Sequence, residues 1–158
     1  MQDLILKAEE VINFLRQHSQ DISSIKAYEA ALLGYKIALD FYKAPFLGSK
    51  AKKLVEEAVK INPQNPIALI EKANVLYFSP PLFGGSKTEA IKYYEKAAIL
   101  MEKDSSYSYK NWRYINLLVF MYQVYLEENK KEQAEKLKNK IETIEPNFNF
   151  QWIKNIKR

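Results

Sequence analysis

The spacing of apolar residues constrains the fold of this chain more than any other feature of its sequence. Apolar residues recur at intervals of three and four positions through nearly the whole chain, which is the period of an amphipathic helix. The sequence contains only four glycines and six prolines, whereas a β-sandwich needs turn residues about every 8–12 positions. Together, these two observations predict an all-α fold.

Prolines, glycines and cap residues divide the chain into seven predicted helices and a short tail. The predicted helices cover residues 1–19, 25–43, 50–62, 66–79, 87–103, 112–128 and 131–144. In the first of them, the expected apolar stripe consists of Leu4, Val11, Ile12, Phe14 and Leu15. The tail has aromatic and apolar residues at helical spacing, which predicts a short capping helix.

Several helix starts carry clear capping signals. Residues 21–24 supply cap candidates for the second helix. Asn65 followed by Pro66 combines a cap residue with a proline in the first turn, where its missing N–H costs nothing. Ser86 and Glu89 have the spacing of a capping box, in which each side chain satisfies a free backbone N–H. These signals fix the expected starts of the second, fourth and fifth helices.

Two connections share an unusual composition of proline, phenylalanine, leucine and glycine. They lie at residues 43–48 and 80–85. We expect Pro45 and Gly48 to end the second helix, so that Ser49 caps the third. Because the two connections are similar, we expect them to emerge on the same edge of the fold.

Small residues recur at positions where closely packed helices need them. The third, fifth and seventh predicted helices begin their apolar stripes with Ala51, Ala90 and Ala134. Gly34 lies 17 residues before Ala51, and Ala73 lies 17 residues before Ala90. The equal spacing across two different connections indicates duplication of one supersecondary unit.

These residues resemble the pattern of tetratricopeptide repeat proteins, whose unit of about 34 residues is a pair of antiparallel helices followed by a proline. The resemblance covers roughly residues 22–146, although the first two units are longer between their helices. It is best in the last unit, at Tyr122, Tyr125, Ala134, Ile141 and Pro146. The proline- and glycine-containing connections also resemble those of small bacterial, often exported, repeat proteins of unassigned role.

The resemblance implies a single domain, residues 1–158, folded as a right-handed α-solenoid of about three antiparallel helix pairs. The pairs would cover residues 22–63, 64–104 and 106–146, with capping segments at 1–20 and 147–158. One helix pair cannot bury its own apolar face, so neighbouring pairs stack and terminal helices seal the ends.

The sequence offers no pattern typical of catalysis, metal binding or cofactor binding. It has no cysteine, which excludes disulfides and thiolate metal sites. His18, the only histidine, has no second ligand at metal-binding spacing. The carboxylates of Glu56 and Glu57 diverge by about 100° on a helix and cannot converge on one bond. Residues 84–87 (GGSK) have the wrong spacing for a phosphate loop. We therefore expect no enzyme, metal or cofactor.

The chain is basic, with a formal net charge of +5. Such a balance can attract nucleic acid, a membrane surface or an acidic protein. Most of the excess is lysine, which is typical of solvated helix faces. Residues 107–112, with Lys110 and Arg113, keep a nucleic-acid-binding adaptor open as an alternative function, because tyrosines can stack bases beside cations. A second alternative is a small-ligand or lipid-binding helper of an export or uptake system.

No segment approaches the ~20 apolar residues that a membrane span requires. The first residues mix charged and apolar side chains and lack the continuous apolar stretch of a leader peptide. The expected compartment is the cytoplasm, or the periplasm if a leader has been removed.

We expect the chain to be a binding module whose partner is a protein or peptide. In the repeat family the first helix of each pair lines the inner face, which here means the second, fourth and sixth predicted helices. The expected contact residues on that face are Tyr35, Ile70, Asn74, Tyr77 and Tyr122. This face is mainly apolar and aromatic, which suits an amphipathic helix or an extended apolar segment.

The two connections form a second candidate surface through Phe46 and Phe83. If these side chains are exposed, they are better contact candidates than the inner face, because large exposed apolar patches mark interaction sites.

Overall fold

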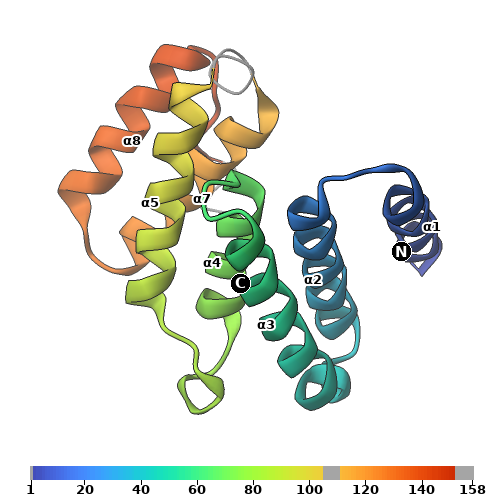
Figure 1. Cartoon of the computed structure of the whole chain (residues 1–158). Coiled ribbons are helices and arrows are strands. Elements are labelled where there is room, and N and C mark those ends of the chain that lie inside the picture. The colour runs from blue at the N-terminus through green and yellow to red at the C-terminus, as the bar shows by residue number, and fades with distance from the viewer. Residues whose placement is uncertain (1, 105–110, 152–158) are drawn as a thin grey trace. The chain divides into compact units, whose positions relative to one another are not determined.

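The computed structural model describes residues 2–104 and 111–151. These residues form helices joined by short connections and contain no strand, which confirms the predicted all-α fold (Figure 1). The elements are α1 (Gln2–His18), α2 (Ile22–Leu39), the 3₁₀ turn η1 (Phe41–Lys43), α3 (Ala44–Ile61), α4 (Pro66–Phe78), the 3₁₀ turn η2 (Pro81–Phe83), α5 (Lys87–Lys103), α7 (Trp112–Glu127) and α8 (Lys131–Ile144). None of the helices in these residues has the length and apolar character needed to cross a bilayer.

The chain divides into two compact units, residues 1–97 and 98–158. The boundary falls inside α5, so that most of this helix belongs to the first unit and its last turn to the second. Whether the two units form one domain depends on how they pack together, so the single domain of residues 1–158 stays a prediction.

The predicted caps at Asn65 and Ser86 are confirmed, and among the cap candidates 21–24 it is Asp21 that caps α2, which begins at Ile22. The Asp21 carboxylate accepts a hydrogen bond from the Ser24 N–H at 3.0 Å, and the Ser86 hydroxyl oxygen accepts one from the Glu89 N–H at 3.2 Å. The Asn65 side-chain oxygen accepts the Ile67 N–H at 3.0 Å. Each side chain thus satisfies a backbone donor that has no partner within its own helix.

The predicted boundary between the second and third helices is wrong. The α2 helix ends at Leu39 rather than near residue 43, and α3 begins at Ala44, so Gly48 and Ser49 lie inside a helix. Pro45 occupies the first turn of α3, where a proline removes no intrahelical hydrogen bond. It therefore starts the third helix instead of ending the second.

Alanines bring α2, α3 and α4 of the first unit close together. Ala27, Ala58 and Ala68 form one fully buried cluster across the three helices. A second cluster joins α2 to α3 and contains Ala30, Leu33, Ala51 and Val55. Because alanine side chains are short, the helix backbones can approach closely at these points. The expected role of Ala51 in helix packing is confirmed.

Gly34 does not have the expected role. It is exposed, and a Cβ atom built on it would meet nothing within 4 Å. The close packing of α2 is instead provided by Ala27 and Ala30. The spacing from Gly34 to Ala51 is therefore not equivalent to that from Ala73 to Ala90, and it does not support a duplication.

The first helix packs against α2 through a narrow face. Ile12 is its only buried residue, and Leu15 is half-buried. Leu4, Val11 and Phe14 are exposed, so the predicted stripe of α1 is only partly correct. At about 100° per residue, Leu4 and Val11 lie within about 40° of the half-buried Leu15 around the helix, so the 3–4 spacing alone does not show which residues of the stripe pack.

The second unit contains an antiparallel pair formed by α7 and α8 (Figure 1). Asn129 turns the chain between them with a positive φ of 56°, as expected from its position. In α8 the buried residues are Ala134 and Ile141, which lie seven positions apart on one face. The predicted register of this helix is confirmed.

Candidate functional site

The residues predicted to line an inner binding face have very different environments. Tyr35 of α2 is exposed, and Ile70 and Asn74 of α4 are half-buried. Tyr77 and Tyr122 are buried. Within the first unit, Tyr35, Ile70 and Asn74 therefore remain accessible to different degrees, whereas Tyr77 belongs to the core.

The two buried tyrosines pack against other aromatic rings of their own units. The Tyr77 ring meets the Phe78 ring edge-on, with centroids 5.1 Å apart, and the Lys87 ammonium lies 5.3 Å from the Tyr77 centroid. In the second unit, Tyr122 meets Phe150 edge-on at 5.4 Å. Aromatic contacts of this kind stabilise a core, and they correct the expectation that these side chains are free to contact a partner.

Asn74 takes part in a hydrogen-bonded network within the first unit. The Tyr94 hydroxyl donates to the Asn74 side-chain oxygen at 2.6 Å, and the Asn74 amide donates to a Glu71 carboxylate oxygen at 2.9 Å. Burial of the Glu71 carboxyl group raises its pKa to about 7, although the Asn74 hydrogen bond acts in the opposite direction. Asn74 thus has a structural role between α4 and α5.

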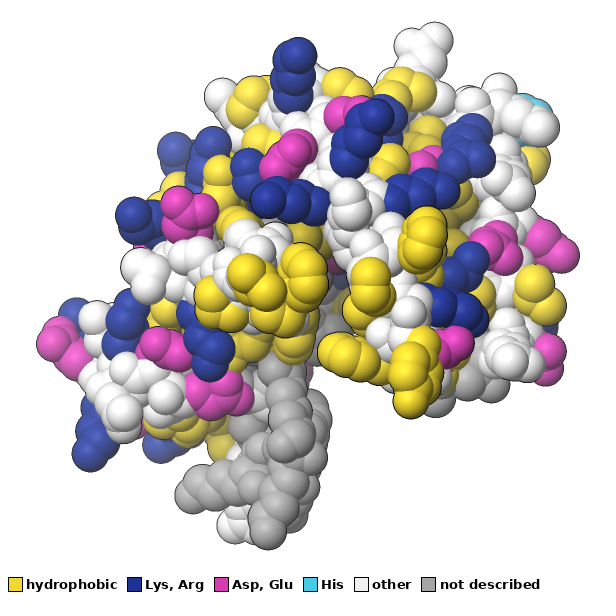
Figure 2. All heavy atoms as spheres, turned by 90° about the horizontal axis from the view of Figure 1, so that it is seen from below, with side chains coloured by type: hydrophobic (Ala, Val, Ile, Leu, Met, Phe, Trp, Pro, Cys, Tyr) yellow, Lys and Arg dark blue, Asp and Glu magenta, His cyan; other side chains and the backbone are white. Residues whose placement is uncertain are grey.

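Both aromatic residues of the predicted loop surface are exposed. The most exposed hydrophobic side chains near them are Phe41 (77%), Tyr42 (96%), Phe46 (88%), Leu82 (88%) and Phe83 (63%). We call these five residues the loop edge. Figure 2 shows hydrophobic side chains gathered over the end of the first unit at which η1 and η2 are found. The loop edge is therefore more accessible than the residues predicted for the inner face.

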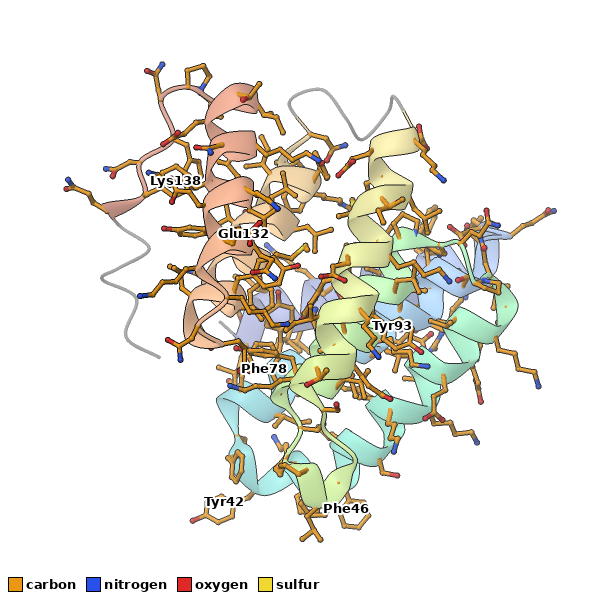
Figure 3. The ribbon with its side chains drawn as sticks, turned by 90° about the vertical axis from the view of Figure 1, so that its left-hand side faces the viewer. Tyr42, Phe46, Phe78, Tyr93, Glu132 and Lys138 are labelled. Atoms are coloured by element: carbon orange, nitrogen blue, oxygen red, sulfur yellow. The ribbon has the colours of Figure 1, made fainter. Side chains whose placement is uncertain are left out.

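The two halves of the loop edge lie at the same end of the first unit. Tyr42 and Phe46 are both at that end in Figure 3, beside the turn that contains η2. Lys52 of α3 reaches the η2 turn, because a Cβ on Gly84 would lie 2.7 Å from the Lys52 ammonium nitrogen. The expected shared edge is therefore seen. However, residues 44–48 form helix, whereas residues 81–83 form a 3₁₀ turn, so the connections are not equivalent.

Sequence reasoning missed three of the five residues in the loop edge. Phe41 and Tyr42 were missed because the second helix was predicted to continue to residue 43, and Leu82 was noted only as part of the composition of its connection. Their position beside proline-containing connections was the available signal. Apolar residues there have no helix face through which to reach the core.

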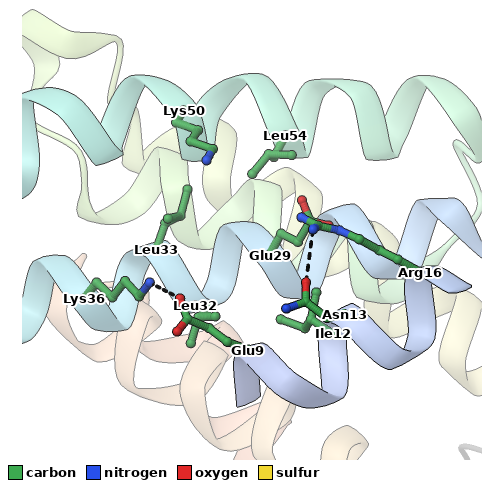
Figure 4. A pocket seen from close by; sticks show the side chains of 10 residues that line it. All are labelled: Glu9, Ile12, Asn13, Arg16, Glu29, Leu32, Leu33, Lys36, Lys50 and Leu54. Carbon is green, nitrogen blue, oxygen red and sulfur yellow. Dashed lines mark hydrogen bonds and ion pairs between the residues drawn. The ribbon is translucent and has the colours of Figure 1, made fainter. Parts of the chain in front are cut away.

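A groove also opens in the first unit, above α2 and between α1 and α3 (Figure 4). Its volume is about 360 Å³, which is within the usual range of ligand pockets. The apolar part of its lining consists of Ile12, Leu32, Leu33 and Leu54. The polar part consists of Glu9, Asn13, Arg16, Glu29, Lys36 and Lys50.

Ion pairs across the groove connect α1 to α2. Arg16 Nε donates to a Glu29 carboxylate oxygen at 2.6 Å, and the Lys36 ammonium pairs with Glu9. No carboxylate of the described residues pairs with Lys50, which projects from α3 at the rim. The groove thus combines an apolar lining with one cation that is available to a ligand.

The second unit holds a smaller polar cluster in a pocket of about 320 Å³. Glu102 accepts hydrogen bonds from the Tyr114 hydroxyl at 2.7 Å and from the Lys140 ammonium at 2.5 Å. Burial and the neighbouring Glu102 carboxylate raise the pKa of the Tyr114 hydroxyl. A tyrosine in this state is a poor proton donor near neutral pH, so the cluster is suited to tying α5, α7 and α8 together.

The remaining candidates from the sequence have structural surroundings. His18 Nδ1 donates to the Phe14 carbonyl oxygen at 2.8 Å, and the two rings stack at 4.2 Å. In the part of the chain that the structure describes, no group of three His, Asp or Glu side chains could hold a metal ion. The tyrosine-rich stretch 107–110 lies outside the described residues. Trp112, at the start of α7, is exposed beside the Arg113 guanidinium.

Known proteins give no further guide to this arrangement. No protein-family model matches the chain, and neither a curated protein nor a solved structure matches it.

Proposed function

We propose that this chain is a non-catalytic helical-repeat module of the tetratricopeptide kind, in which antiparallel pairs stack as a right-handed α-solenoid and bind a protein or peptide segment. The observation that carries the proposal is the groove over α2 between α1 and α3. It is concave, its lining is part apolar and part charged, and it lies on regular helices. Such grooves are a recurring means of holding a helical or extended peptide.

The packing within each unit supports the repeat part of the proposal. Ala51 and Ala134 are buried at helix contacts in two different helix pairs. The pairs α2–α3 and α7–α8 each turn back through a short connection. In such a stack, two helices that flank a third without contacting each other leave a groove over it, as α1 and α3 do over α2.

The chemistry of the groove indicates the kind of segment that it holds. The leucines of α2 and α3 accept an apolar side chain, which removes apolar surface from water. Lys50 then pairs with a carboxylate on the same segment, since the other two cations of the groove already have carboxylate partners. We therefore expect the bound segment to place an acidic residue next to a leucine or an aromatic residue.

Site-directed cross-linking tests this proposal directly. Because the chain has no cysteine, Asn13→Cys places a single attachment site for a photoactivated cross-linker at the groove. Lys60→Cys, exposed near the end of α3, provides a matched control site away from the groove. In native lysate we expect one protein to cross-link to Asn13→Cys and not to Lys60→Cys.

The charge-reversal variant Lys50→Glu should abolish that cross-link, because it removes the available cation from the rim. Lys60→Glu makes the same change in net charge and should leave it intact. Equal cross-linking from both cysteine positions, or an unaltered cross-link in Lys50→Glu, would show that the groove is not the binding site.

A further inference from the structure

The loop edge has features that neither the fold nor the proposed peptide groove explains. Tyr42, Phe46 and Leu82 are almost fully exposed, so their side chains make few contacts with their own chain. Exposed single hydrophobic residues are ordinary, but several at one end of a unit form a patch that calls for a partner.

The η2 turn holds its side chains in a defined direction. Pro80 and Pro81 restrict the backbone, and the Pro80 carbonyl accepts hydrogen bonds from the N–H groups of Phe83 at 2.9 Å and Gly85 at 3.1 Å. The Ser86 N–H donates to the Leu76 carbonyl oxygen at 2.9 Å, which ties the end of the turn back to α4. Leu82 and Phe83 are therefore presented on a fixed support, which lowers the entropy lost when they bind.

The charge around the loop edge is mainly positive. Residues 41–53 include four lysines, and residues 79–88 include one; neither stretch contains an Asp or Glu. The carboxylates that flank the two stretches are Asp40, which pairs with Lys43 at 3.2 Å, and the exposed Glu89. Exposed aromatic side chains thus project from a surface that attracts anions.

The projecting shape of the loop edge favours a lipid bilayer over a protein as its anionic partner. A protein partner would need a preformed hollow for each projecting side chain, whereas lipid headgroups rearrange around whatever enters them. Aromatic residues favour the boundary between headgroups and acyl chains, and lysines favour anionic headgroups. A short projecting edge with both residue types meets the requirements for surface attachment without a membrane span.

We propose that the loop edge docks on an anionic lipid bilayer, with Tyr42, Phe46, Leu82 and Phe83 in the headgroup region and Lys43 and Lys52 against lipid phosphates. This contact involves different residues from the peptide groove. The two sites can therefore be tested, and can fail, independently.

Vesicle co-sedimentation of the full chain tests the proposal. We expect the protein to sediment with vesicles made of equal parts phosphatidylcholine and phosphatidylglycerol, and to stay in solution with phosphatidylcholine alone. Added salt should weaken the binding, because it screens charges at the bilayer surface.

Two variants separate the apolar contribution from the charged one. Phe46→Ser combined with Phe83→Ser should lower the vesicle partition coefficient about tenfold or more, because two apolar side chains no longer leave water. Lys43→Gln combined with Lys52→Gln should lower it at least about fivefold, as expected for lysines at an anionic surface.

Matched controls are available on other faces of the same unit. Leu4→Ser with Phe14→Ser removes two exposed hydrophobic residues from α1, and Lys7→Gln with Lys60→Gln removes two exposed lysines. Both controls should bind vesicles as the unaltered chain does, and circular dichroism melting should show that all four variants remain folded.

The proposal is overturned if the unaltered chain fails to sediment with phosphatidylglycerol vesicles, or if the loop-edge variants bind as strongly as their controls. It is also overturned if the loop-edge variants lose capture of an acidic protein or of RNA while vesicle binding is absent throughout. Loss of vesicle binding in the loop-edge variants alone supports it.

Discussion

The side-chain amide of Asn65 donates to the Ser23 hydroxyl oxygen at 2.9 Å, across 42 positions of the chain. The same amide nitrogen donates to the Ser24 hydroxyl oxygen, also at 2.9 Å. Ser23 in turn donates to the Ala58 carbonyl oxygen near the end of α3. Since the Asn65 oxygen caps α4, one asparagine connects three helices of the first unit.

Asn65→Ala should destabilise the protein by about 2–4 kcal/mol, because it removes a helix cap and leaves buried hydroxyl groups short of a partner. Urea unfolding followed by circular dichroism measures the change. The control is Asn62→Ala, since the Asn62 side-chain oxygen accepts the exposed Gln64 N–H, and we expect it to cost less than about 1 kcal/mol. Similar losses for the two variants would contradict the connecting role of Asn65.

Ala90→Leu should destabilise by roughly 1–3 kcal/mol, because a larger side chain at a fully buried position overpacks the core. Ala90 has no exposed surface, whereas Lys92 is exposed two residues later on the same helix. Lys92→Leu therefore adds a leucine to α5 without overpacking and should change the melting temperature little. An unchanged melting temperature for Ala90→Leu would mean that Ala90 faces solvent instead of the core.

Glu71 should make stability depend on pH below neutrality. Burial raises its pKa to about 7 in the folded protein, so the folded state holds a proton that the unfolded state releases at lower pH. Stability from this group is fully present below the unfolded pKa of about 4.3 and is lost as pH rises toward 7.

Glu71→Gln should remove this fall in stability and make the protein more stable than the unaltered chain at pH 8. Denaturant unfolding at a series of pH values measures the effect, with Glu56→Gln as the control for removing a carboxylate from an exposed position. If the unaltered chain and Glu71→Gln lose stability in parallel between pH 5 and pH 7, then Glu71 is not the responsible group.

Phe83→Ala should change the free energy of unfolding by less than about 0.5 kcal/mol, as is usual for surface positions. The contrasting variant is Leu69→Ala in α4, where the side chain is fully buried and truncation should cost about 2–5 kcal/mol. Thermal melts of both proteins make the comparison. A large loss in Phe83→Ala would mean that the ring packs under its turn.

The sequence predicted those parts of the structure that depend on local chemistry. Asn65 and Ser86 cap helices because their side chains reach donors two or three residues away, and Asn129 turns the chain because it tolerates a positive φ. The errors arose where the same residue is compatible with two structures. Pro45 can follow a helix or start one. In the structure it occupies the first turn of α3, and the Asp40 carboxylate, which accepts the Tyr42 N–H, caps the η1 turn before it.

The candidate surfaces were harder to predict, because burial depends on which helices become neighbours. Tyr35 in α2 and Tyr77 in α4 were both predicted to line the inner face, yet one is exposed and the other buried. The groove was not predicted at all, since its lining combines residues of α1, α2 and α3, and the apolar period of each helix does not show how the three pack together. For Phe46 and Phe83, the sequence left open whether the side chains are exposed or packed under their connections.

The backbone of the η2 turn restricts which residues can replace its glycines, but it does not restrict the residues at its tip, positions 82 and 83. Gly84 has a φ of +84°, and a Cβ on Gly85 would lie 1.8 Å from the Ser79 carbonyl oxygen, so neither position accepts another residue without a change in the turn. Positions 82 and 83 project outward and carry no such restriction. Their side chains can be exchanged while the scaffold stays intact, which makes this turn a place where surface affinity can be altered by evolution or engineering independently of folding.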